Sequence, residues 1–210
     1  MILLHFECKK RKPLGANSMD KLAAMEDIAL STEQEKEILR VATQYKREAE
    51  KCFGAKAYLS GCVLMGAAME AVLLSTANCF PKIVASAKCA PKKDGKIKRL
   101  DRWTFMDLLA VAKELNWLPS GLSLKDEWDS AQAGIGDYVE VVRQIRNLIH
   151  PVRYVNDFSK KRVAKKYLVA CFEIVDTATD YLYSLVSDSL KIMLEEKERR
   201  SNQKTKSSTN

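Results

Sequence analysis

The sequence has few of the residues that interrupt regular structure. Only 8 Gly and 5 Pro occur among its 210 residues, which favours long helices over many short strands. It shows no strand alternation and no internal repeat. Hydrophobic residues make up 47% of the chain, enough for a core, and the length predicts one domain with tails. We therefore expect an all-α fold, an antiparallel helical bundle.

Metal ligands are scarce as well. His5 and His150 are the two histidines, and the six cysteines form no C-x-x-C pair. Structural zinc sites use closely spaced Cys and His ligands, so we expect neither a metal nor a cofactor. Cys52, Cys62 and Cys171 stand among apolar helix positions, which predicts small buried side chains in a reducing cytoplasm.

Long apolar runs are also missing. No run approaches the roughly 18 residues of a membrane span. The apolar start at residues 1–4 is too short for a signal-peptide core, and the basic run at 9–12 follows it instead of preceding it. We expect a cytoplasmic protein with no membrane partner. The basic run is either a localisation tag or a solvated tail, and Met1 and Met19 both remain possible starts.

Apolar residues recur at helical spacing through most of the chain, which predicts a single domain over residues 18–198 between flexible tails at 1–17 and 199–210. The predicted helices are Asp20–Ala29, Thr32–Phe53 with Ser31 or Thr32 as N-cap, Ala55–Cys79, a helix capped by Thr104 and closed by Trp117-Leu118-Pro119, a largely helical stretch over 128–150 that Gly134 and Gly136 either bend or divide into two helices, and a last helix capped by Ser159. The last helix would run roughly 60 Å, longer than the bundle. Part of it must protrude, bend or pair with a second subunit.

The segment Ala55–Cys79 is apolar nearly all round, which is typical of a helix in the middle of a bundle. Its one charge is Glu70. A buried carboxylate is costly without a partner, so Glu70 either reaches the bundle edge or pairs with Arg143 or Arg146.

Residues 82–102 contain eight Lys or Arg against Asp94 and Asp101, in a chain whose formal net charge is +8. We expect a long basic loop that is either solvated or in contact with nucleic-acid phosphates. No aromatic residue interrupts the basic run before Trp103, so base stacking is not indicated.

The segment from Glu140 to Pro151 predicts an amphipathic helix stopped by a proline. Its apolar side would carry Tyr138, Val141, Val142, Ile145, Leu148 and Ile149, and its polar side Arg143, Arg146, Asn147 and His150. Glu140 is the only nearby acid on this side, so the arginines lack obvious partners four residues away. Forked guanidiniums, an amide and an imidazole suit a phosphodiester, although an ordinary wet helix face would have the same pattern.

The run Arg143-Gln144-Ile145-Arg146-Asn147-Leu148-Ile149-His150-Pro151 resembles the motif of HEPN-superfamily helical domains. That motif has an arginine, a polar residue and then a histidine after four to six intervening positions. Arg143 with Gln144 fits this spacing better than Arg146 with Asn147. The resemblance extends more weakly to Glu70 and to the helix over 103–118.

This resemblance implies a HEPN-like bundle, a homodimer whose motifs share one cleft, and metal-independent RNA cleavage by attack of the 2′-hydroxyl on the adjacent phosphate. His150 would transfer the proton and Arg143 would hold the phosphate, while Asn147 and Arg146 orient either group. Tyr154 would border the site. The resemblance also implies a defence or toxin–antitoxin setting with an antitoxin partner. The alternatives are a non-catalytic interaction or dimerisation module, and RNA binding without cleavage.

Overall fold

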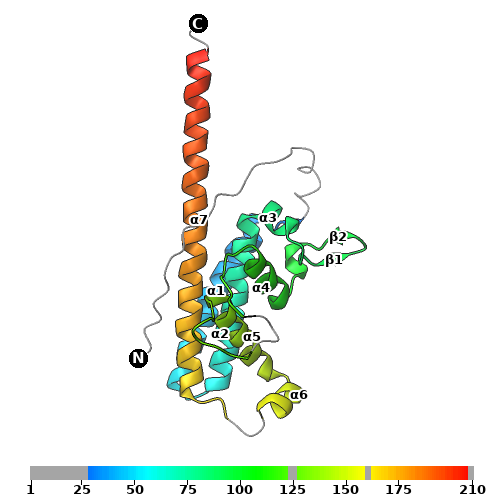
Figure 1. Cartoon of the computed structure of the whole chain (residues 1–210). Helices are drawn as coiled ribbons and strands as arrows, with labels where there is room; N and C mark the ends of the chain where they lie inside the picture. Colours follow the sequence, from blue (N-terminus) through cyan, green and yellow to red (C-terminus); the bar gives the residue numbers. More distant parts are fainter. Residues whose placement is uncertain (1–27, 123–126, 159–161, 208–210) are drawn as a thin grey trace.

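The computed structural model describes residues 28–122, 127–158 and 162–207, and it is predominantly helical (Figure 1). Its helices are α1 (Thr32–Gly54), α2 (Tyr58–Cys79), α3 (Pro81–Ser86), α4 (Phe105–Glu114), α5 (Ile135–Arg146), α6 (Pro151–Arg153) and α7 (Lys165–Ser207). One small hairpin joins β1 (Lys92–Lys93) to β2 (Lys96–Ile97). The all-α class and the long C-terminal helix are confirmed.

Helix α2 occupies the centre, and α1, α4, α5 and α7 all pack on it. Its small residues allow close approach: a Cβ on Gly61 would lie 2.5 Å from Leu168 Cδ2, and one on Gly66 would lie 2.6 Å from Arg146 Cβ. Met65 and Met69 are fully buried on either side of Gly66. The predicted central position of this helix is therefore confirmed.

By length and composition, α2 also passes as a membrane-spanning helix, contrary to the expectation that no run would reach that length. The interruptions by Ser and Thr within it are mild enough to keep its mean hydropathy high. In this bundle, 61% of its most apolar window is buried against other helices.

Two helices start where local sequence places their caps. Ser31 Oγ accepts from the Gln34 N–H at 3.2 Å, and Gln34 Oε1 accepts from the Ser31 N–H at 3.0 Å. Thr104 and Asp107 form the same reciprocal pair at the start of α4. Such boxes satisfy N–H groups that the first helical turn leaves without acceptors. The predicted helix Asp20–Ala29 and the tail at 1–17 lie outside the described residues, except for residues 28 and 29.

Several boundaries differ from the sequence prediction, including the start of α2 at Tyr58 and the start of α5 at Ile135. The region 82–102 is not one loop, because α3, the hairpin and a 3-10 turn (Leu100–Arg102) fill it. The hairpin turns at Asp94 and Gly95, which both have positive φ, as Asp-Gly hairpin turns require. Helix α7 starts at Lys165, beyond Ser159, which lies outside the described residues.

Helix α7 includes residues 199–207, for which the sequence predicted a tail. Its 43 residues correspond to about 65 Å. Figure 1 shows its C-terminal half standing clear of the bundle. Of the three outcomes that its length allowed, protrusion is the one observed.

Candidate functional site

The predicted Arg/His helix is broken into three pieces. Helix α5 ends at Arg146, a 3-10 turn covers Asn147–Ile149, and α6 begins at Pro151. Val142, Ile145 and Leu148 are buried as predicted, but Ile149 is 59% exposed. The tighter 3-10 turn rotates the chain away from the α-helical register, which explains why Ile149 leaves the apolar side.

His150 consequently does not continue the polar stripe of α5. Its backbone is extended (φ −79°, ψ 118°), as expected for a residue before proline. Pro151 does not stop a helix here. It opens α6 at the first helical position, where its missing N–H costs nothing. The His150 side chain is exposed, and in the described part of the chain it makes no hydrogen bond or ion pair.

Arg143 is tied to an acid of its own helix. Its Nε and Nη2 donate to the two carboxylate oxygens of Glu140 at 2.8 and 2.6 Å, and both side chains are 15% exposed. Gln144 donates to the same carboxylate at 3.1 Å. Arg143 has no acid four residues away, as the sequence indicated, but Glu140 lies three residues away and is close enough to pair with it.

The two charges in this pair stabilise each other's ionised form. The hydrogen bond to Glu140 raises the pKa of Arg143 despite partial burial of the guanidinium. Burial would raise the pKa of Glu140, but hydrogen bonds from Arg143 and Gln144 outweigh it and hold that pKa below its usual value. An incoming phosphate would have to compete with this bidentate carboxylate for the same guanidinium edge.

Arg146 has a different partner, Glu70, 76 positions earlier on α2. The distance from Nη2 to Oε2 is 2.7 Å, and the side chains are 33% and 25% exposed. This is one of the pairings that the lone charge of α2 predicted. Gly66, one turn before Glu70, lets the Arg146 stem lie directly against the α2 backbone.

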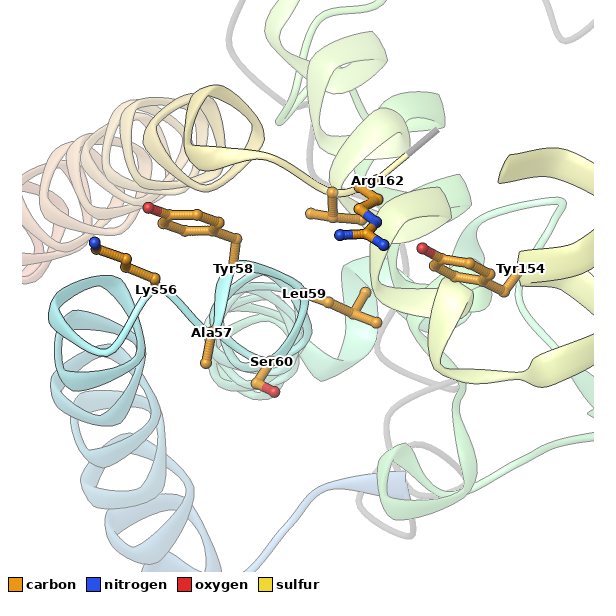
Figure 2. A pocket seen from close by; sticks show the side chains of 8 residues that line it. Lys56, Ala57, Tyr58, Leu59, Ser60, Tyr154 and Arg162 are labelled. Atoms are coloured by element: carbon orange, nitrogen blue, oxygen red, sulfur yellow. The ribbon is translucent and has the colours of Figure 1, made fainter. Parts of the chain in front are cut away.

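Tyr154 lies in a separate hollow. A cavity of about 310 Å³ is lined by Lys56, Ala57, Tyr58, Leu59, Ser60, Tyr154, Arg162 and Val163. Figure 2 shows the Arg162 guanidinium near the hydroxyl end of Tyr154, at the start of α2. Neither Arg143 nor His150 lines this hollow, so Tyr154 is not brought together with them there.

Asp137 is a buried polar centre that the sequence reasoning missed. This carboxylate, 4% exposed, accepts hydrogen bonds from Lys113 Nζ at 2.9 Å and from the N–H groups of Gly121, Leu122 and Gly134. Ser120 Oγ donates to it as well. Burial would raise the pKa of Asp137, but these donors together lower it to about 2. An acid three residues after Gly134, at the spacing of a capping box, was the available signal.

Glu140, Arg143 and Arg146 belong to α5 and Glu70 to α2, whereas His150 lies beyond the 3-10 turn and does not continue their side of the helix. Asn147 lies half-buried in the 3-10 turn between Arg146 and His150. Both guanidiniums are paired with carboxylates, and the His150 imidazole has no hydrogen-bond or ion-pair partner among the described residues. Within the described residues, no group of three or more His, Cys, Asp or Glu side chains is placed to hold a metal.

Comparisons with protein-family models, with curated proteins and with solved structures find no match to this chain.

Proposed function

We propose that this chain is a HEPN-like helical module that self-associates through the free half of α7 and is not a catalyst. The observation that carries this proposal is the exposure of apolar side chains on that half. Tyr183 is 51% exposed, Leu190 52%, Ile192 54% and Leu194 61%. Leu182 is the last buried α7 residue among those whose burial is described.

A helix in this situation gains from a partner. The 25 residues after Leu182 correspond to about 37 Å of helix. Isolated helices in water are marginal, since packing of an apolar face supplies most helical stability in proteins. Fully burying a Leu side chain contributes about 1.5–3 kcal/mol, so covering the half-exposed Leu190 and Leu194 together contributes about as much, and covering Tyr183 adds to it.

The geometry of this segment favours a second copy as that partner. Tyr183, Leu190 and Leu194 fall within about 40° of one another at 100° per residue, which makes one narrow stripe. Narrow apolar stripes are the seams of paired helices. When two copies pair through one shared segment, each stripe covers the other and the assembly closes as a dimer.

The state of the Arg/His corner supports the non-catalytic part of the proposal. Phosphodiester cleavage would need a guanidinium that is free to take up developing negative charge. Here Glu140 occupies Arg143 through two hydrogen bonds, and Glu70 occupies Arg146. In the proposed module the Arg146–Glu70 pair fixes α5 to α2 and the Arg143–Glu140 pair lies within α5, so both have structural roles.

The test is a solution mass by light scattering. The chain has a mass of 23.7 kDa, and we expect twice that value at about 50 μM for the unaltered protein. The double variant Leu190→Asp, Leu194→Asp should run as a monomer, because it places carboxylates in the apolar seam. The matched control is Ser184→Asp with Ile192→Asp, two exposed positions that lie about 100° and 180° from Tyr183 around the same helix and therefore outside the stripe. A monomeric unaltered protein, or dissociation of the control to the same extent, would refute self-association through this stripe.

A metal-independent endoribonuclease is the second candidate, and the exposed imidazole of His150 favours it. This imidazole is open to a ligand, and Arg146 donates only Nη2 to Glu70, which leaves other N–H groups for a phosphate. RNA would be incubated in EDTA with the unaltered protein and with His150→Ala. Cleavage lost only in that variant establishes the nuclease and overturns the non-catalytic proposal. If both proteins leave the RNA intact, the non-catalytic proposal stands.

A further inference from the structure

The hairpin β1–β2 and its flanks concentrate the positive charge of the molecule. Residues 82–102 hold eight basic and two acidic residues, a net of +6 in a chain whose total is +8. Seven of the eight cations are exposed, and they are Lys82, Lys88, Lys92, Lys93, Lys96, Arg99 and Arg102. We call this set the basic finger. In Figure 1 the hairpin projects away from the helical bundle, so its cations face solvent.

Hydrogen bonds and buried side chains anchor the segment that carries the basic finger to the bundle. Trp103 Nε1 donates to the Lys98 carbonyl at 2.9 Å, and the Lys98 N–H donates to the Pro91 carbonyl at 2.9 Å. On the other side, the Glu114 carboxylate accepts from the N–H groups of Lys88 and Cys89 at 2.7 and 2.9 Å. The side chains of Leu100 and Trp103 are buried in the core. The exposed cations therefore project from a segment that is fixed to the helical bundle.

The strand register brings like charges together. Lys93 pairs directly with Lys96 across the hairpin, so both side chains rise from the same face. Like charges at directly opposed positions destabilise a sheet. Among the described residues, no ion pair involves Lys92, Lys93 or Lys96. The repulsion between these lysines is therefore not relieved by an acid in that part of the chain. A polyanion laid on this face would relieve it.

We propose that the basic finger is a docking surface for the phosphate backbone of nucleic acid, independent of self-association through α7. The lysines are spread over both strands and both flanks, which suits a chain of phosphates better than one isolated anion. None of the exposed large apolar side chains lies between residues 82 and 102, whereas binding to an anionic membrane is usually supported by inserted apolar groups. Because the basic finger has no exposed aromatic residue on which bases could stack, we expect it to bind nucleic acid without sequence preference.

The experiment compares salt-dependent binding by two variants of equal charge. Fluorescein-labelled RNA and DNA 20-mers, single- and double-stranded, are titrated by anisotropy between 50 and 300 mM KCl. The finger variant is Lys92→Gln, Lys93→Gln, Lys96→Gln. The control is Lys36→Gln, Arg47→Gln, Lys191→Gln, which removes the same charge from exposed positions on α1 and α7. All six positions are exposed, so both variants should retain the far-ultraviolet circular dichroism of the unaltered protein.

We expect binding of unrelated sequences with similar affinity. The finger variant should lose more than about tenfold in affinity at 100 mM KCl, and its slope of log K against log salt should become shallower by about 2–3, since each lost phosphate contact contributes about 0.7–0.9. The control should keep most of the slope. Equal losses in both variants, or no binding by the unaltered protein, would overturn the proposal. Finger-dependent binding to phosphatidylserine vesicles without nucleic-acid binding would also overturn it, in favour of a membrane surface.

Discussion

Replacing Asp137 by Asn should cost more stability than any other single polar change in the described bundle. This carboxylate has 4% exposure and accepts from the Lys113 ammonium, the Ser120 hydroxyl and three backbone N–H groups. An amide of the same shape keeps one acceptor oxygen but turns an N–H₂ group toward these donors, and it leaves the Lys113 charge without its partner. Losses of this kind cost about 2–4 kcal/mol.

The pH dependence of this loss follows from the pKa of Asp137. The pKa falls from 3.8 to about 2 on folding, and about 1.4 kcal/mol per unit makes the ionised carboxylate worth about 2.5 kcal/mol near neutrality. Because the folded pKa is the lower one, the contribution is complete above about pH 5 and is lost as the pH falls through 2. The loss of unfolding free energy caused by Asp137→Asn should therefore be about 1 kcal/mol smaller at pH 3 than at pH 6.

Urea unfolding followed by circular dichroism at pH 6, 4 and 3 measures both effects. The control is Asp176→Asn, which removes an ion pair with Lys46 whose two side chains are 49% and 43% exposed. That change should cost under about 1 kcal/mol. If Asp137→Asn lowers the free energy of unfolding by less than about 0.5 kcal/mol at pH 6, or by the same amount at every pH, the proposed role of the Asp137 carboxylate is refuted.

Two further predictions concern packing and thiol chemistry. Gly66→Ala should destabilise by at least about 1 kcal/mol in thermal unfolding, because its Cβ would lie 2.6 Å from Arg146 Cβ, whereas Gly54→Ala meets no atom within 4 Å and should stabilise by a few tenths. Cys89 should be alkylated very slowly at pH 8, since burial and the Glu114 carboxylate raise its pKa to about 12, and Glu114→Gln should speed labelling by more than about tenfold in a mass-spectrometric time course.

The features that sequence predicted correctly depend on nearby residues. The start of α1 is fixed by Ser31 and Gln34, three positions apart, and the start of α4 by a similar box. The central position of α2 followed from its lack of a polar face, because a helix that is apolar all round is stable only when surrounded. Each prediction needed only composition or spacing within one turn or one helix.

The errors fall where distant contacts override local pattern. The two-residue strands at 92–97 are too short to show alternation, and their stability comes from the Asp-Gly turn and from anchoring by Trp103 and Glu114. Asp137 was not singled out from the sequence. Its hydrogen-bond donors lie at residues 113–122 and 134, and residue spacing does not show that these groups meet the start of α5. The break of α5 at Arg146 depends on Pro151, five positions later, which the sequence predicted to stop a helix and which instead begins α6.

The Arg/His segment shows why a short motif does not by itself specify chemistry. Arginine and histidine at this spacing are compatible with a phosphate site and with a pair of structural ion links, and the sequence between them is identical in the two cases. The difference is made by two carboxylates, Glu140 one turn away and Glu70 on another helix, 76 positions from Arg146. Glu70 could be foreseen, because a single acid on an apolar helix must find a cation. Its pairing with Arg146 draws that guanidinium toward the core at Gly66 and away from His150's exposed side, so the same contact that stabilises the bundle works against a catalytic pair.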